Sequence, residues 1–181
     1  MQYAHGGDIY TYKNLLDFSI NVNPLGPADA VVEAAARSLQ RIGEYPDSRS
    51  RELRNALAEK KGLAAERFVI GNGAADLLFS LVLAEKPQKA MIVIPAFSEY
   101  EQALKTVGCE ILYHEVKKEN NFRLGTDLTE KITSELDFLF LCSPSNPAGQ
   151  AVEKEFLIKI AEKCEKERVR LVLDECFVQF L

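Results

Sequence analysis

Apolar positions recur along this chain with two different periods. In the first third they follow helical spacing over residues 28–42 and again over about 50–61. Gly62 directly follows the second segment, and glycine is a typical residue just past a helix C-terminus. The first 27 residues are rich in turn-forming glycine and proline and show no period. The pattern therefore predicts an irregular N-terminal arm followed by two amphipathic helices.

Beyond the second helix, short apolar runs alternate with amphipathic segments. The runs predict strands over residues 68–70, 90–94, 110–116, 138–142 and 170–173. The amphipathic segments predict helices over about 74–84, 98–107 and 153–167. This alternation predicts an α/β fold, with three α/β/α layers and a mostly parallel sheet. Runs such as Met91–Ile94 and Phe138–Leu141 are apolar throughout, which fits strands buried on both faces.

Composition narrows the class of protein and its partners. The chain is 47% hydrophobic and 27% charged, which is typical of a globular protein, and its net charge of −5 argues against nucleic acid as a partner. No apolar stretch approaches the ~20 residues of a membrane span. The four cysteines show no CxxC spacing and the two histidines no helical ligand spacing, so we expect no metal site. A reduced, cytoplasmic protein is expected.

Four unusual segments each follow a predicted strand. Because ligands bind at the carboxyl ends of parallel strands, these segments are expected to meet at that edge of the sheet, the rim. Together they supply a nest of backbone amides, an aromatic ring, an amide side chain and a carboxylate. The segments are Gly71–Asp76, Pro95–Tyr100, Ser143–Gly149 and Asp174–Glu175.

Each segment also has an ordinary structural interpretation. Gly71–Gly73 before a helix suits a bound phosphate, but it equally suits a tight turn. Phe97 fits the core, and Ser143–Pro147 fits a rigid turn. Asp174 is the most informative, because a carboxylate after a buried strand needs a cation or hydrogen-bond donors. A P-loop ATPase would also place an acid there, but the chain has no GxxxxGK[ST] loop.

In this order, the four segments resemble those of fold-type I pyridoxal-phosphate (PLP) enzymes, particularly the histidinol-phosphate aminotransferase group. Within that group, His5–Gly7 and Asp17–Gly26 resemble the threonine-phosphate decarboxylase branch, which serves cobalamin biosynthesis. The resemblance covers nearly the whole chain. It implies that residues 1–45 form an arm and helix of a small domain, and that residues 46–181 form most of a large PLP-binding domain.

The resemblance also implies roles for residues around PLP. The backbone amides expected to hold the cofactor phosphate are those of Gly73, Ala74 and Ala75. Phe97 is expected to stack on the pyridine ring, and Asn146 to hydrogen-bond its O3′ oxygen. Asp174 is expected to pair with the protonated pyridine nitrogen, which keeps the ring an electron sink.

Other implied roles lie in the N-terminal part of the chain. Tyr45 matches a tyrosine that reaches the cofactor phosphate of the neighbouring subunit, which implies a homodimer; it also fits a turn aromatic that covers the core. His5, Gly6 and Asn23 are expected near the phosphate of a small phosphorylated amino-acid substrate, although a solvated arm is the alternative.

Two features depart from the aminotransferase pattern. Phe177 stands three residues after the aspartate, where aminotransferases of this group usually have a tyrosine, and this favours the decarboxylase branch. The lysine that holds PLP covalently and the arginine that binds the substrate carboxylate lie downstream in the family. We therefore expect both beyond Leu181, no catalytic residue within the chain, and no activity of the 181 residues alone.

Three functional hypotheses remain open at this point. The first is decarboxylation of L-threonine O-3-phosphate to (R)-1-amino-2-propanol phosphate. The second is an aminotransferase that acts on histidinol phosphate or a related amino acid. The third is a non-catalytic module, and the presence of a Ser-Lys motif downstream would distinguish an enzyme from it.

Overall fold

The computed structural model describes residues 6–13 and 15–181, so His5 lies outside the described part of the chain. It comprises two compact units, Met1–Phe68 and Val69–Leu181. The assignment of residues 46–181 to one cofactor-binding domain concerns the whole protein and stays a prediction. None of the helices in the described part is long and apolar enough to cross a membrane.

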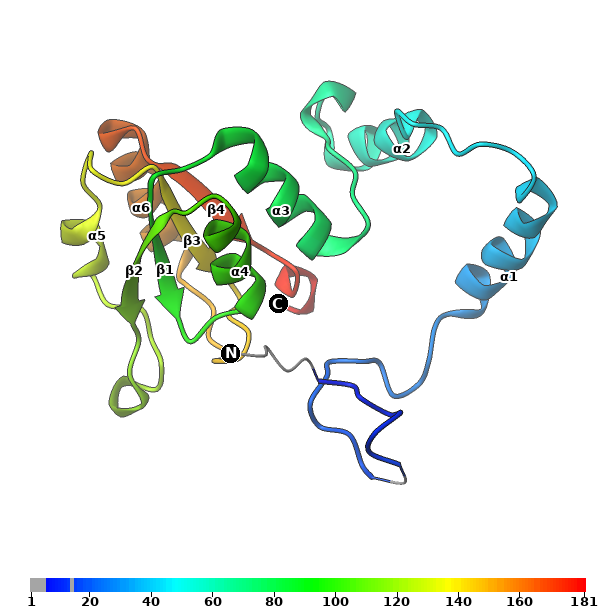
Figure 1. Ribbon diagram of the computed structural model, residues 1–181, viewed down its shortest axis with the longest axis horizontal. Coiled ribbons are helices and arrows are strands. Elements are labelled where there is room, and N and C mark those ends of the chain that lie inside the picture. Colours follow the sequence, from blue (N-terminus) through cyan, green and yellow to red (C-terminus); the bar gives the residue numbers. More distant parts are fainter. Residues whose placement is uncertain (1–5, 14) are drawn as a thin grey trace. The chain divides into compact units, whose positions relative to one another are not determined.

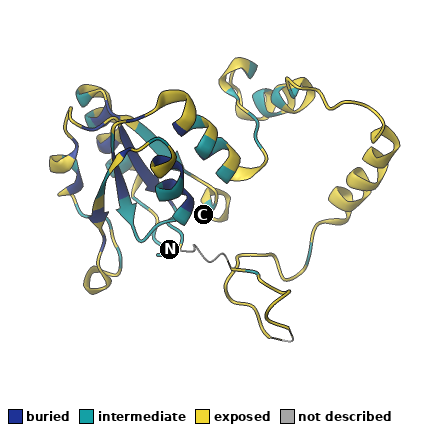
Figure 2. Cartoon of the chain, in the orientation of Figure 1, coloured by how far each residue is buried: buried dark blue, intermediate teal, exposed yellow. Residues whose placement is uncertain are grey.

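The first unit contains an irregular segment and two helices. The helical elements are α1 (Asp29–Ser38), η1 (Leu39–Arg41), α2 (Arg51–Lys61) and η2 (Ala65–Arg67). Both predicted helices are therefore confirmed, and α2 ends as expected, with Gly62 in the left-handed conformation at φ 65°. No residue of α1 or α2 is buried, and Figure 2 accordingly draws these helices in yellow and, in parts of α2, teal.

The second unit is built on a four-stranded sheet (Figure 1). Its strands are β1 (Lys89–Ile94), β2 (Glu110–Glu115), β3 (Phe138–Cys142) and β4 (Arg170–Asp174). They are parallel and lie in the order β2-β1-β3-β4. The predicted parallel α/β sheet is thus confirmed.

Helices cover both faces of this sheet. They are α3 (Gly73–Glu85), α4 (Ser98–Thr106), α5 (Leu128–Lys131) and α6 (Lys154–Glu167), and short 3-10 turns add η3 (Lys118–Asn120) and η4 (Val178–Phe180). Alternate strand residues point to opposite faces. Ile92 and Phe140 accordingly pack in one core cluster with α3 and α4, whereas Met91 and Leu139 pack in a second cluster with α5 and α6. The three predicted layers are present.

One predicted strand is wrong. Phe68–Ile70 is not a strand, although the backbone of Phe68 is extended at φ −105° and ψ 128°. A strand exists only when its N–H and C=O groups pair with a neighbour. No other strand of the described residues pairs with this segment. Apolar composition alone therefore overestimated the number of strands.

Candidate active site

Asp174 is the carboxylate that the sequence placed at the rim, and the structure holds it from two sides. It is the last residue of β4 and lies in register with Cys142, the last residue of β3. The hydroxyl of Tyr100 donates to its Oδ2 at 2.6 Å, and the backbone N–H of Cys176 donates to its Oδ1 at 3.0 Å. These two donors fix the orientation of a half-buried charged group, which would otherwise be costly to hold away from water.

Tyr100 is the residue of this site that sequence reasoning missed. It lies on α4 and is only 1% exposed. Its ring stacks on Phe140 with centroids 5.3 Å apart, so the core fixes its position. Burial and the hydrogen bond to Asp174 both raise the pKa of the phenol, which therefore stays protonated and donates. Its position at the start of α4, three residues after Phe97, was the available signal.

Phe97 lies at the N-terminus of α4 and is half-buried. Its ring meets that of Tyr100 edge-on, with centroids 5.9 Å apart and an interplanar angle of 81°. The side chain also packs against the core cluster beneath α3 and α4. Phe97 therefore contributes to the core while lying beside the tyrosine that holds Asp174.

The loop over residues 143–150 directly follows β3 and lies at the same end of the sheet as Asp174. The N–H of Ser143 donates to the backbone oxygen of Asp174 at 2.9 Å, so the two strands remain paired to their ends. Asn146 lies in this loop, half-buried, with its backbone N–H against the thiol of Cys142. Phe97, Asn146 and Asp174 thus lie at one end of the sheet. Phe97 contacts Tyr100, which binds Asp174. Asn146 contacts Cys142, the register partner of Asp174.

The N-terminus of α3 forms the remaining part of the predicted site. Gly73, its first residue, has φ +87°, and an added Cβ would meet nothing within 4 Å. Asn72 makes no side-chain capping bond. The first N–H groups of a helix lack intrahelical partners and attract anions. Figure 1 shows that α3 runs antiparallel to β1, so the N-terminus of α3, which begins at Gly73, points toward the rim.

Three of the described residues predicted to contact the cofactor or the substrate lie in the first unit. Tyr45 is fully exposed, at 100%. Gly6 lies so close to Ser19 that any Cβ there would clash with the backbone of Ser19. Asn23 donates from its side chain to the backbone oxygen of Gly26 at 3.0 Å and so stabilises a turn. The substrate and subunit roles expected of them stay predictions.

Comparison with known proteins identifies the family of the chain. Residues 13–181 match the sequence profile described as aminotransferase class I and II. The chain belongs to this family. Members of the family are PLP enzymes, so the family implies PLP.

Named relatives of the family include decarboxylases and aminotransferases. The chain is 38% identical to the threonine-phosphate decarboxylase of Salmonella typhimurium, over 98% of the chain and 51% of that protein. It is 33% identical to the histidinol-phosphate aminotransferase of Methanococcoides burtonii, over 93% of the chain and 46% of that protein. The chain therefore spans about half the length of the curated relatives it matches.

Solved structures of this family share the fold. The histidinol-phosphate aminotransferase from Clostridium acetobutylicum superimposes with a TM-score of 0.79 at 28% identity, over 92% of this chain and 48% of that one. The L-threonine-O-3-phosphate decarboxylase from Porphyromonas gingivalis gives 0.70 at 22% identity, over 84% of this chain and 44% of that one. The second likeness shows the fold alone.

Proposed function

We propose that the protein is a PLP-dependent lyase that decarboxylates L-threonine O-3-phosphate to (R)-1-amino-2-propanol phosphate in cobalamin biosynthesis. The observation that carries the proposal is the carboxylate of Asp174, which Tyr100 and the amide of Cys176 hold at the rim of a parallel sheet. Relatives named threonine-phosphate decarboxylase, at 38% identity, support the choice of substrate.

The donor groups of this chain fit PLP chemically. The start of α3, where the side chain of Asn72 makes no capping bond and Gly73 leaves open space, suits the cofactor phosphate. Phe97 offers a ring face, and Asn146 offers an amide to the O3′ oxygen. Asp174 would hold a proton on the pyridine nitrogen through an ion pair. When bound, PLP supplies the electron sink for cleavage of a bond at the substrate α-carbon.

The roles of the N-terminal residues follow from the resemblance to the family and are part of this proposal. His5, Gly6 and Asn23 would bind the phosphate of the substrate. Tyr45, which is fully exposed in its own unit, would reach the cofactor phosphate of a second subunit in a cytoplasmic homodimer. Replacing His5 with alanine should then raise KM for threonine phosphate while PLP absorbance stays unchanged.

A second candidate is an aminotransferase that acts on histidinol phosphate, because a relative with that name is 33% identical. Phe177 argues against it. This side chain follows Asp174 at the position where aminotransferases of the group usually have a tyrosine, and it carries no hydroxyl to reach O3′. In the structure its ring instead lies 6.3 Å from that of Phe180.

The test is an assay of the protein at its full natural length with both substrates. With L-threonine O-3-phosphate we expect release of carbon dioxide and formation of the amino alcohol phosphate. With histidinol phosphate and a 2-oxo acid we expect no amino-group transfer. The opposite result would establish the aminotransferase, and no activity with either substrate despite bound PLP would refute both candidates.

Two variants make this assay specific to the site. Asp174→Asn should lower kcat by at least about 100-fold, the scale on which one preorganised electrostatic partner acts. Asp137→Asn is the matched control, since Asp137 lies before β3 at the opposite end of the sheet and accepts from Gln88 N at 2.7 Å and Lys89 N at 3.0 Å. It should retain activity.

A further inference from the structure

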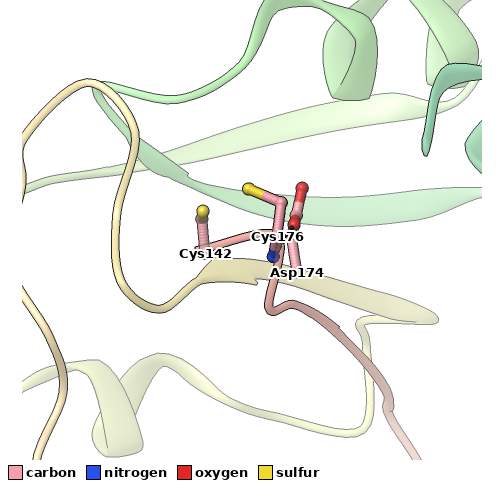
Figure 3. Close-up of side chains that lie close together, drawn as sticks. All are labelled: Cys142, Asp174 and Cys176. Carbon is pink, nitrogen blue, oxygen red and sulfur yellow. Dashed lines mark hydrogen bonds between the residues drawn. The ribbon is translucent and has the colours of Figure 1, made fainter. Parts of the chain in front are cut away.

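Two thiols lie against the carboxylate of Asp174. The Sγ atoms of Cys142 and Cys176 and a carboxylate oxygen of Asp174 all lie within 4.8 Å of one another. Figure 3 shows the three side chains gathered at the ends of β3 and β4. Cys142 is buried, Asp174 is half-buried and Cys176 is exposed, so the cluster can be reached from solvent on one side.

The fold builds this cluster from its backbone. Cys142 and Asp174 are register partners at the ends of two parallel strands. Phe140 and Val172, two residues earlier in each strand, pack in the cluster beneath α3 and α4. Since side chains alternate along a strand, Cys142 and Asp174 face the same way. The N–H of Cys176 donates to Asp174 and turns its thiol back toward the strand ends.

This set of atoms matches the ligands that Zn²⁺ prefers. Zinc binds thiolate sulfur at about 2.3 Å and carboxylate oxygen at about 2.0–2.2 Å in tetrahedral geometry. Two sulfur atoms on one zinc ion are then about 3.8 Å apart. Ligand atoms within 4.8 Å of one another therefore need to close by only about 1 Å. Three protein ligands leave the fourth position for water.

We propose that Cys142, Asp174 and Cys176 form a binding site for a thiophilic divalent cation, Zn²⁺ among the physiological ions. Tyr100 supports the site from outside, because its hydrogen bond to Oδ2 orients the carboxylate. Cys142 ends β3 and Cys176 lies two residues beyond β4, with no CxxC spacing between them, which is why the sequence did not predict the site.

Protons must leave both thiols when the ion binds. Partial loss of hydration at the sulfur, and then the neighbouring carboxylate of Asp174, raise the pKa of Cys176 to about 12, and burial raises the pKa of Cys142. Each thiol therefore releases its proton to solvent as its sulfur binds the metal.

A consequence for catalysis follows if the proposed function is also correct. The same carboxylate cannot bind a metal ion and pair with the pyridine nitrogen of PLP in one orientation. Zn²⁺ and PLP would then compete for Asp174, and the metal ion would inhibit the enzyme by weakening its hold on the cofactor. This competition, unlike the metal site itself, rests on the proposed function.

The metal site is tested by titrating the reduced, cofactor-free protein at its full natural length with Co²⁺. We expect one equivalent to bind, with the near-ultraviolet and visible absorption of tetrahedral cobalt thiolate, and Zn²⁺ to displace it. Cys176→Ser and Asp174→Asn should weaken binding by at least about 100-fold, more than loss of an outer partner costs. The exposed position of Cys176 makes its replacement tolerable for folding.

Cys109→Ser is the matched control, because Cys109 precedes β2 at the other end of the sheet. It should bind Co²⁺ as the unmodified protein does. Equal affinity in Cys176→Ser, or no stoichiometric binding by the reduced protein, would overturn the proposal. So would a protein that binds no metal and only forms a disulfide between Cys142 and Cys176.

Competition is measured separately, as the apparent Kd of PLP with and without Zn²⁺. We expect Zn²⁺ to raise this Kd in the unmodified protein and leave it unchanged in Cys176→Ser, which retains Asp174. Cobalt binding without competition would uphold the site and refute the shared use of Asp174. A protein that binds cobalt but never PLP would uphold the site and refute the proposed function.

Discussion

Tyr100 donates a 2.6 Å hydrogen bond to Asp174 across 74 positions of sequence. The bond ties α4 to the end of β4. Because the ring of Tyr100 also stacks on Phe140 in the core, the orientation of the carboxylate depends on core packing. The orientation of Asp174 therefore depends on the packing of the sheet and α4, and not on the conformation of a surface loop.

Replacing Tyr100 with phenylalanine tests this coupling. The variant keeps the stacked ring and removes only the hydroxyl, so the free energy of unfolding should fall by about 1.5–3 kcal/mol, the value of a hydrogen bond to a charged group. PLP should bind about tenfold more weakly, or about 1.4 kcal/mol, since the carboxylate is free to turn. Denaturant unfolding and absorbance titration measure the two effects. Tyr113→Phe on β2 is the control, and an equal loss of PLP affinity there would contradict the prediction.

Gly73→Ala, compared with Gly108→Ala, should distinguish the effect of backbone strain on stability from an effect on PLP binding. A non-glycine residue at φ +87° costs about 1–2 kcal/mol, and its relaxation would re-aim the first N–H groups of α3. Gly108→Ala imposes similar strain at φ +70°, beyond the C-terminus of α4, and an added Cβ meets nothing there either. Both variants should unfold more easily, but only Gly73→Ala should lose affinity for PLP. Equal PLP affinity in the two would remove α3 from the proposed phosphate site.

His114 is a buried titratable group away from the rim. It lies on β2 at 3% exposure, with its Nδ1 3.0 Å from Nζ of Lys131. An ammonium only donates, so Nδ1 accepts this hydrogen bond. Burial, and then the charge of Lys131, lower the pKa of His114 below 6.5, while Asp127 acts weakly in the opposite direction.

The stability of the fold should therefore fall in mild acid. Below pH 6.5 the unfolded chain binds a proton at His114 that the folded chain resists, so unfolding becomes easier as pH falls toward the lowered folded-state pKa. Above pH 6.5 this group contributes no pH dependence. Denaturation midpoints between pH 7.5 and 5.5 should decrease less in His114→Gln than in the unmodified protein. Identical slopes would show that His114 titrates normally.

The 181-residue chain by itself should not be labelled at one lysine by PLP and borohydride. Lys117 follows β2, which lies three strand spacings, roughly 14 Å, from β4. Lys154 begins α6, on the opposite face of the sheet from Tyr100. Labelling mapped by mass spectrometry should be partial and spread over several lysines. Stoichiometric labelling of one lysine, with decarboxylation, would contradict the expectation that the covalent lysine lies beyond Leu181.

The sequence predicted more of the fold than of the site. The strand over residues 138–142 was predicted with the bounds that the structure shows, because a continuous apolar run is a local signal. The strand over residues 68–70 was not found, because pairing needs a partner elsewhere in the chain. Asp174 was singled out as a rim carboxylate, and the structure places it at the end of β4. Its partner Tyr100 was missed, because an aromatic residue on an amphipathic helix reads as ordinary core.

By itself, the sequence determined the three layers, the direction of the strands and the chemical groups at their ends. Those features depend on periodicity and on the order of elements, both of which are local properties of the chain. Only the tertiary structure decided which groups touch. Tyr100, Cys142 and Cys176 meet at Asp174 because strand register and helix packing bring them there, and neither is encoded by spacing along the chain.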